Sequence, residues 1–140
     1  MKREFPNHPI LCVGGIIIQD GSVLLVRRGN PPLKGEWTLP GGMVELGEKV
    51  QSAVRREIRE ETGLRVEPTR LAAIYERIVR LGGRVKYHYT VLDYVCQVKG
   101  GHLKAGSDVA GARWVAYEEL KRYRLRRPAI EAIHGAIKPG

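Results

Sequence analysis

The segment Gly41–Leu64, GGMVELGEKVQSAVRREIREETGL, decides how the rest of the chain is interpreted. It begins with Gly41 and Gly42, a pair that predicts a turn which β-branched residues could not easily make. The residues that follow have the apolar spacing of a helix, and Gly63 is suited to the left-handed cap that often ends one. The segment therefore predicts a glycine turn, a helix and a helix stop in direct succession.

Three acidic side chains of the predicted helix lie on one of its faces. Glu57, Glu60 and Glu61 are spaced at i, i+3 and i+4, and the neighbouring apolar stripe consists of Val50, Val54 and Ile58. Like charges about 4 Å apart repel by roughly 4 kcal/mol at an effective dielectric constant near 20, so positive charge is needed among them. Oxygen ligands at this density suit a hard divalent cation such as Mg²⁺ or Mn²⁺.

A second interpretation of the acidic run is a solvated helix face. In that case the carboxylates pair with the arginines of the same helix, which are Arg55, Arg56 and Arg59. Arg56 lies one turn before Glu60 and supplies part of the positive charge under either interpretation. The acidic run considered alone leaves both interpretations open.

The spacing of the whole segment separates these interpretations. It consists of Gly42, five residues, Glu48, seven residues, Arg56-Glu57-Ile58, one residue, Glu60-Glu61, one residue and Gly63-Leu64. This pattern resembles the signature box of the Nudix hydrolases at every specified position. The preceding run Gly35–Gly42, GEWTLPGG, also resembles the usual lead-in to that box.

The resemblance implies roles for the residues of the box. The implied metal ligands are a main-chain carbonyl at the Gly41–Gly42 turn, assigned to Gly42, and the carboxylates of Glu57, Glu60 and Glu61. Glu48 and Arg56 would support these ligands from behind, with Arg56 holding Glu57 in place, which is physically sensible for a carboxylate crowded by two others. The implied cofactor is Mg²⁺ or Mn²⁺.

Length and charge limit the class of protein. A chain of 140 residues is long enough for one domain with a real core, so we expect a single domain over residues 1–140. The net charge of +9 and pI of 9.9 favour anionic partners. The basic residues are scattered and the aromatic residues form no repeated stacking pattern, so a phosphorylated small molecule is favoured over nucleic acid.

Targeting signals and disulfides are not predicted. The N-terminal run MKREFPNHP is followed by a short apolar stretch that Gly14 and Gly15 interrupt, which fits neither a signal peptide nor a membrane span. Cys12 and Cys96 lie in apolar runs where an unpaired thiol is usually a small buried side chain. We therefore expect a cytoplasmic protein.

Strand signals flank the box on both sides. Two apolar runs meet at Asp20-Gly21 within Ile10–Arg28, and two more, Val66–Val79 and Val85–Val98, meet at Gly82-Gly83. A short strand at Ala112–Val115, a helical turn at Glu118–Tyr123 and a last helix from Pro128, with Ile130, Ile133 and Ile137 at helical spacing, complete the pattern. We predict an α/β (α+β) fold with a mixed sheet between helices, which is also the α/β/α sandwich that the Nudix resemblance implies.

Several residues outside the helix are candidates for substrate binding, each with a structural alternative. Arg27 and Arg28 end the first hairpin, where one could meet a phosphate or both could be solvated. Trp37 could stack on a base or fill the core. His88 could contact substrate or transfer a proton, or it could be an ordinary strand histidine, on the face opposite Tyr87 and Tyr89.

The glycines suggest places where a ligand approaches the backbone. Gly14 and Gly15 lie inside a predicted strand, where they mark either a bulge or close ligand approach. The loop Gly29–Gly42 is rich in Pro and Gly, so it must run over the surface toward the acidic helix and deliver Gly41 and Gly42 to the site.

The chemistry of such a site is hydrolysis at phosphorus. One divalent ion neutralises phosphate oxygens, and a second can lower the pKa of a bound water that becomes the nucleophile. The resemblance places the general base either on a box glutamate such as Glu57 or on an acid of a distant loop. In this chain that loop offers Asp108, with Glu118 and Glu119 further on; Glu57 is the first candidate and Asp108 the second.

Three further tracts look like those of the small bacterial or archaeal ADP-ribose pyrophosphatase branch of the family; they are Leu24–Pro32, Tyr87–Tyr89 and Ala112–Val115. The implied reaction is hydrolysis of ADP-ribose to AMP and ribose 5-phosphate. One alternative is a nucleoside triphosphate pyrophosphohydrolase that cleaves oxidised nucleotides, and another is a binding module without catalysis. Many relatives are dimers, so a homodimer is also left open.

Overall fold

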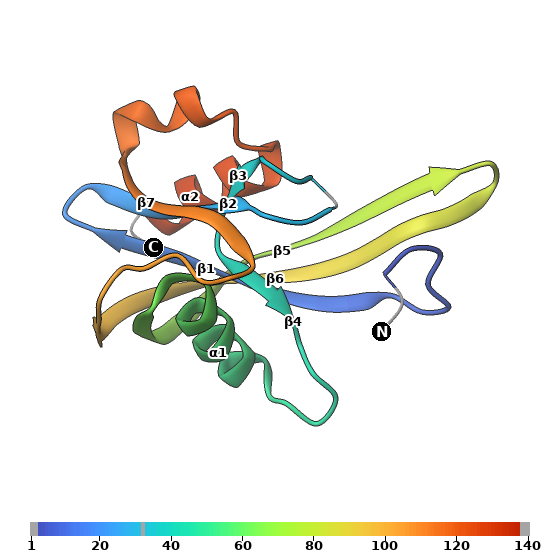
Figure 1. Ribbon diagram of the computed structural model, residues 1–140, viewed down its shortest axis with the longest axis horizontal. Helices are drawn as coiled ribbons and strands as arrows, with labels where there is room; N and C mark the ends of the chain where they lie inside the picture. Colours follow the sequence, from blue (N-terminus) through green and yellow to red (C-terminus); the bar gives the residue numbers. More distant parts are fainter. Residues whose placement is uncertain (1–2, 32, 138–140) are drawn as a thin grey trace.

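The computed structural model describes residues 3–31 and 33–137, and within them seven strands form one mixed sheet (Figure 1). The strands are β1 (Ile10–Gln19), β2 (Ser22–Arg28), β3 (Trp37–Thr38), β4 (Gly41–Met43), β5 (Leu64–Leu81), β6 (Arg84–Gly101) and β7 (Val109–Ala116). Their order is β3-β2-β1-β6-β5, while β4 pairs with β1 and β7 pairs with β2. β1 and β6 run parallel and the other pairs run antiparallel.

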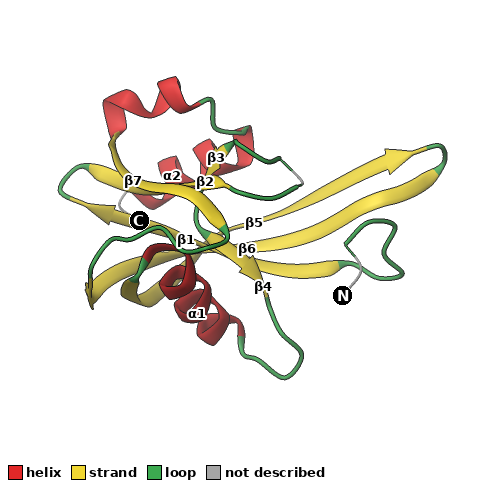
Figure 2. Ribbon diagram, in the orientation of Figure 1, coloured by secondary structure: helices red, strands yellow, loops and turns green. Residues whose placement is uncertain are grey.

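Helices cover both faces of the sheet, as predicted (Figure 2). Helix α1 (Val50–Thr62) packs on one face, and the 3₁₀ helix η1 (Tyr117–Tyr123) and helix α2 (Arg127–Ile137) pack on the other. The apolar stripe predicted for α1 is confirmed, because Val54 and Ile58 are buried and Val50 packs against the same cluster. Gly63 caps this helix in the left-handed conformation, with φ at 77°.

Both predicted hairpins are present. The turn between β1 and β2 has positive φ at Asp20 and Gly21, and the turn between β5 and β6 has positive φ at Gly82 and Gly83. The second hairpin is longer than predicted, because β5 already begins at Leu64 and β6 continues to Gly101. It extends well beyond the rest of the sheet in Figure 1.

The prediction for the segment Gly29–Gly42 is wrong in two respects. The segment contains the short strands β3 and β4 instead of only a loop, and Gly41 and Gly42 lie in β4 instead of a turn. Neither glycine has positive φ. Glycine is needed at Gly41 for space, because a Cβ there would overlap the main-chain oxygen of Val13 on the neighbouring strand. Within the tract Leu24–Pro32, Pro32 is outside the described residues.

The face that α2 buries differs from the predicted isoleucine stripe. Ile133 is fully buried, whereas Ile130 and Ile137 are 38% and 42% exposed. The buried neighbours of Ile133 are Ala129 and Ala132, whose small side chains let the helix lie near the sheet. Helical spacing alone did not reveal which side of the isoleucines faces the core.

The connection between β6 and β7 is attached to the end of α1. The amide of Lys104 donates to the carbonyl of Thr62 at 2.8 Å, and the amide of Gly106 donates to the carbonyl of Glu61 at 2.9 Å. These bonds satisfy carbonyl groups that the end of a helix leaves open. They also bring Asp108, which is distant in sequence, beside the acidic face of α1.

The two cysteines are free, with Cys12 half-buried and Cys96 buried. Burial raises the pKa of Cys12 to about 11 and that of Cys96 to about 12, so both thiols stay protonated at neutral pH. In the described part of the chain, none of the helices has the length and apolar character needed to cross a bilayer.

Candidate active site

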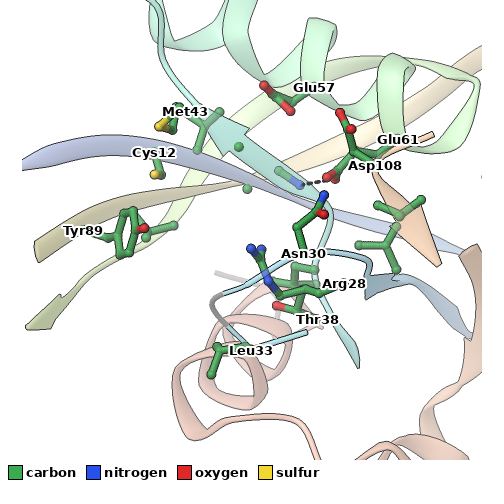
Figure 3. A pocket seen from close by; sticks show the side chains of 18 of the residues that line it. Cys12, Arg28, Asn30, Leu33, Thr38, Met43, Glu57, Glu61, Tyr89 and Asp108 are labelled. Atoms are coloured by element: carbon green, nitrogen blue, oxygen red, sulfur yellow. Dashed lines mark hydrogen bonds between the residues drawn. The ribbon is translucent and has the colours of Figure 1, made fainter. Parts of the chain in front are cut away.

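A cavity of about 580 Å³ lies beside the point where β1 exchanges one antiparallel neighbour, β2, for another, β4 (Figure 3). Its lining includes many of the residues that the sequence nominated, namely Arg28, Gly41, Gly42, Glu57, Glu60, Glu61 and Asp108. Figure 3 shows Glu57, Glu61 and Asp108 on one side of the cavity and Cys12 and Tyr89 toward another end. The cavity is therefore acidic at one end, while its remaining lining combines aromatic and apolar side chains with a few charged ones, which are Arg3, Arg77 and Asp93.

Arg56 connects the acidic residues of the box. Its guanidinium donates to Oε1 of Glu57 at 2.7 Å, to both carboxylate oxygens of Glu48 at 2.8 and 2.9 Å, and to the main-chain oxygen of Met43 at 2.9 Å. It also lies 3.4 Å from Oε2 of Glu60. The expected contact between Arg56 and Glu57 is present, and Glu48 orients the guanidinium from the other side.

Glu57 and Glu61 are partly buried carboxyl groups of the cluster. The amide of Gly41 donates to Oε1 of Glu61 at 2.8 Å, which fixes that side chain. Burial, together with the charges of Glu57 and Asp108, raises the pKa of Glu61 to about 7 against the opposing effect of Gly41 and Arg28. Burial also raises the pKa of Glu57, while Arg56 lowers it.

Glu60 and Asp108 complete the acidic end in different ways. The side chain of Glu60 is 56% exposed and lies at the rim, where it contacts Arg56. Asp108 comes from the segment before β7 and lies beside Glu61 on the same side of the cavity (Figure 3). Carboxylates from two distant parts of the chain therefore meet at one place.

The chemistry of these side chains fits a hard cation. Among the residues that the structure describes, no three acidic, histidine or cysteine side chains are already gathered around one point. However, Glu57, Glu61 and Asp108 supply carboxylate oxygens to one cavity, and burial penalises the negative charge of the first two. A divalent cation with oxygen ligands would relieve that penalty.

Gly42 leaves room for Glu57. A Cβ at Gly42 would overlap the Glu57 carboxylate, so glycine is the residue that lets this side chain lie against β4. Because Arg56 occupies Oε1 of Glu57, the other oxygen, which is directed at Gly42, is the one available for a cation or a proton.

Arg27, Trp37 and His88 are not brought to the acidic cavity. Arg27 and Trp37 line a separate hollow, where the guanidinium of Arg113 lies 5.2 Å from the Trp37 ring. Trp37 also packs against the buried cluster under α2, which agrees with the alternative that it fills the core. His88 is opposite Ile78 in the β5–β6 ladder and is not among the residues that line either hollow.

Sequence reasoning missed the residues at the apolar end of the cavity. These are chiefly Tyr75 from β5 and Tyr89, Val91 and Asp93 from β6, which alternate along one face of the sheet. The signal that could have found Asp93 is a single charge within the apolar run TVLDYVC. A strand charge in such surroundings is rare unless it is paired or functional.

The fold and the acidic cavity agree with comparisons to known proteins. A family model described as NUDIX domain matches residues 8–135. A NUDIX hydrolase structure from Nitrosomonas europaea matches with a TM-score of 0.79 and 26% identity, covering 92% of this chain and 88% of that chain. A MutT NUDIX hydrolase from Burkholderia pseudomallei matches with a TM-score of 0.78 and 28% identity, covering 92% and 98%. The chain belongs to the Nudix family, whose members hydrolyse phosphorus-containing anhydrides and generally use divalent metal ions.

Two relatives that are similar in sequence carry different enzyme names. An ADP-ribose pyrophosphatase of Methanocaldococcus jannaschii is 41% identical over 121 residues, which are 86% of this chain and 70% of that protein. A Mycobacterium tuberculosis protein named "Putative 8-oxo-dGTP diphosphatase 2" is 35% identical over 114 residues, which are 79% and 75%. These two names identify the substrates to be compared, which are ADP-ribose and 8-oxo-dGTP.

Proposed function

We propose that the protein hydrolyses the diphosphate linkage of ADP-ribose to AMP and ribose 5-phosphate, with Mg²⁺ or Mn²⁺ as cofactor. The observation that carries this proposal is one cavity of about 580 Å³, which combines partly buried carboxylates at one end with aromatic and apolar side chains at the other. A nucleoside diphosphate has the same division between a charged part and a flat base. The relative with 41% identity that is named ADP-ribose pyrophosphatase supports this substrate.

The acidic end would hold the cation and the diphosphate. Glu57 and Glu61 are the main ligands, with Glu60, Asp108 and the carbonyl of Gly42 as further oxygen donors. The cation supplies charge neutralisation at the phosphates and lowers the pKa of a bound water. Without it, like charges would keep the diphosphate away from the carboxylates.

The residues of the chain orient the reacting groups. Arg56 holds Oε1 of Glu57, and the Gly41 amide holds Oε1 of Glu61, so each carboxylate presents its remaining oxygen in a fixed direction. Arg28 lines the same cavity, where its positive charge favours binding of a phosphate. A substrate bound here would have its phosphorus atoms held in place before reaction.

Glu57 is the first candidate for the general base that accepts the proton of the attacking water. Arg56 bonds its Oε1 atom, which leaves the oxygen next to Gly42 to accept a proton, and burial raises the pKa of this carboxyl group. Asp108 is the second candidate, because it reaches the same end of the cavity from another segment.

A substrate comparison tests the proposal. Purified protein with MgCl₂ or MnCl₂ is incubated with ADP-ribose and, separately, with 8-oxo-dGTP, and released AMP and nucleoside monophosphate are measured by chromatography. We expect kcat/KM for ADP-ribose to be higher by about 10-fold or more. Strong triphosphate turnover with none on ADP-ribose would refute the proposal in favour of the second candidate, which the Mycobacterium tuberculosis relative supports. Nucleotide binding without any turnover would instead identify a binding module.

A further inference from the structure

Asp93 is a buried carboxyl group that the acidic centre does not use. Its side chain is 2% exposed and lines the cavity from β6, away from the box residues of α1. Among the described residues, its Oδ2 atom has no hydrogen-bond partner and the side chain makes no ion pair. Burial raises its pKa to about 6. A buried acceptor of this kind is costly unless something satisfies it.

The chain makes room for this carboxyl group. Gly14 is directly opposite Asp93 in the β1–β6 ladder, and a Cβ at Gly14 would overlap Oδ1 of Asp93. The ladder continues without a register shift at this position, so Gly14 does not mark a bulge. Its φ is not positive either, so the turn chemistry of glycine is not the reason for it. The space above Gly14 is occupied by the Asp93 carboxyl group.

Asp93 is separated from the acidic end by the width of one strand. Gly14 pairs with Gly41 on one side and with Asp93 on the other, so the backbones of Gly41 and Asp93 are two strand spacings apart, about 10 Å. The Asp93 carboxyl group lies over Gly14, so it is closer to Gly41 than the backbone of Asp93 is. One bound nucleotide could therefore contact both ends of the cavity.

The surroundings of Asp93 suit a base more than a phosphate. Tyr75, Tyr89 and Val91 line the same end and offer aromatic and apolar surface to a flat ring. Burial, together with the charge of Asp93, raises the pKa of Tyr75 to about 12, so its hydroxyl stays protonated. A carboxylate repels phosphate but accepts a hydrogen bond from an N–H group, which would satisfy Oδ2.

We propose that Asp93 reads the nucleobase by accepting a hydrogen bond from its exocyclic amino group, and so selects a 6-amino purine over a 6-oxo purine. The inference rests on the proposed function in taking a purine nucleotide as the ligand of this cavity. A 6-oxo group presents a second acceptor to Oδ2, which leaves both acceptors unpaired or repelling. A buried polar group in a site discriminates in this way because the wrong ligand leaves it unsatisfied.

Two variants separate hydrogen bonding from packing. Asp93→Asn keeps nearly the same shape but adds an amide donor that can bond a 6-oxo group, whereas Asp93→Val removes all hydrogen bonding with a β-branched side chain suited to a strand. Asp20→Asn is the matched control for loss of one negative charge, because Asp20 is in the exposed β1–β2 turn and Asn tolerates its positive φ. Thermal unfolding of each variant checks that the fold is kept.

The kinetic test compares ADP-ribose with inosine diphosphate ribose, its 6-oxo counterpart. We expect the wild type and Asp20→Asn to prefer ADP-ribose by about 10-fold or more in kcat/KM. Asp93→Val should reduce this preference to less than about 3-fold, mainly through KM, and Asp93→Asn should reduce it as well, because its amide can pair with either purine. An unchanged preference in Asp93→Val, or equal use of both substrates by the wild type, would overturn the proposal.

A binding test without metal separates this proposal from the proposed function. Adenosine and inosine, which carry no phosphate for the carboxylates to repel, are titrated into the metal-free protein, and the rise in unfolding temperature is measured. Preference of the wild type for adenosine, lost in Asp93→Val, supports the role of Asp93 even if ADP-ribose is not hydrolysed. Hydrolysis of ADP-ribose with equal binding of adenosine and inosine contradicts the role of Asp93 and leaves the proposed function intact. Binding of neither nucleoside overturns the role of Asp93 as well.

Discussion

Replacing Glu61 by glutamine should stabilise the metal-free protein and at the same time remove its metal-dependent activity. Glutamine has the shape of glutamate and can still accept the Gly41 amide that now bonds Oε1 at 2.8 Å. What it removes is a negative charge that burial and the charges of Glu57 and Asp108 disfavour. The fold loses a penalty, and the site loses a ligand.

The size and pH dependence of the stability effect follow from the pKa. The carboxyl group of Glu61 has a pKa of about 7 in the folded protein against an ordinary value of 4.5, so the folded state binds the proton more tightly than the unfolded state. Its cost is absent below the unfolded pKa, grows as the pH rises between the two values and is complete above about pH 7. The difference of about 2.5 pH units corresponds to at most about 3 kcal/mol.

The assay is urea denaturation of the wild type and Glu61→Gln without metal, at about pH 8 and about pH 4. We expect the variant to be more stable by up to about 3 kcal/mol at the higher pH and equally stable at the lower one. Glu60→Gln is the matched control, because the Glu60 side chain is 56% exposed and its replacement should change stability by less than about 0.5 kcal/mol. Equal effects of the two variants would refute the role of burial.

Added metal tests the ligand assignment in the same samples. A cation at 100 times its Kd stabilises the folded protein by about 2.7 kcal/mol. Mg²⁺ should therefore stabilise the wild type. Both this gain in stability and the rate of turnover should be much smaller in Glu61→Gln. If the variant keeps both the increment and the wild-type turnover, Glu61 does not hold the metal.

Four other substitutions test the acidic end. Gly42→Ala places a Cβ against the Glu57 carboxylate and should lower turnover by about 100-fold, measured at saturating Mg²⁺; wild-type turnover would contradict this. Arg56→Lys cannot reproduce contacts with both Glu48 and Glu57 and should lower the unfolding free energy by about 2 kcal/mol in urea, so unchanged stability would show that the network is weak. Glu57→Gln should lower kcat by about 100-fold or more and Asp108→Asn by about 10-fold or less, and the reverse order would assign the base to Asp108.

Features with local chemical signals could be predicted from the sequence. The two hairpins follow from Asp20-Gly21 and Gly82-Gly83, because their turns require positive φ. The end of α1 follows from Gly63 for the same reason. The acidic face of α1 follows from residue spacing along one helix, which needs no knowledge of the rest of the fold.

Features that depend on pairing between distant segments could not be predicted. Gly41 appears as a turn residue in the sequence, and only the pairing of β4 with β1 shows that its missing side chain makes room for Val13. Arg27 and Arg28 are adjacent in sequence, but successive strand residues face opposite sides, and Arg28 is the one that lines the acidic cavity. The position of Asp93 in the cavity depends in the same way on the parallel pairing of β6 with β1.

The two ends of the cavity create linked but distinct requirements for ligands. Asp93 at one end is buried and Glu61 at the other is partly buried, and burial is the main cause that raises the pKa of each carboxyl group, so the empty protein bears the cost of both near neutral pH. A cation relieves the cost at Glu61 and an amino group relieves it at Asp93, since one is satisfied by charge and the other by a hydrogen bond. A metal ion and an adenine nucleoside without phosphate should therefore each stabilise the protein alone. Because both carboxyl groups line the same cavity, one metal-bound ADP-ribose molecule can meet both requirements together.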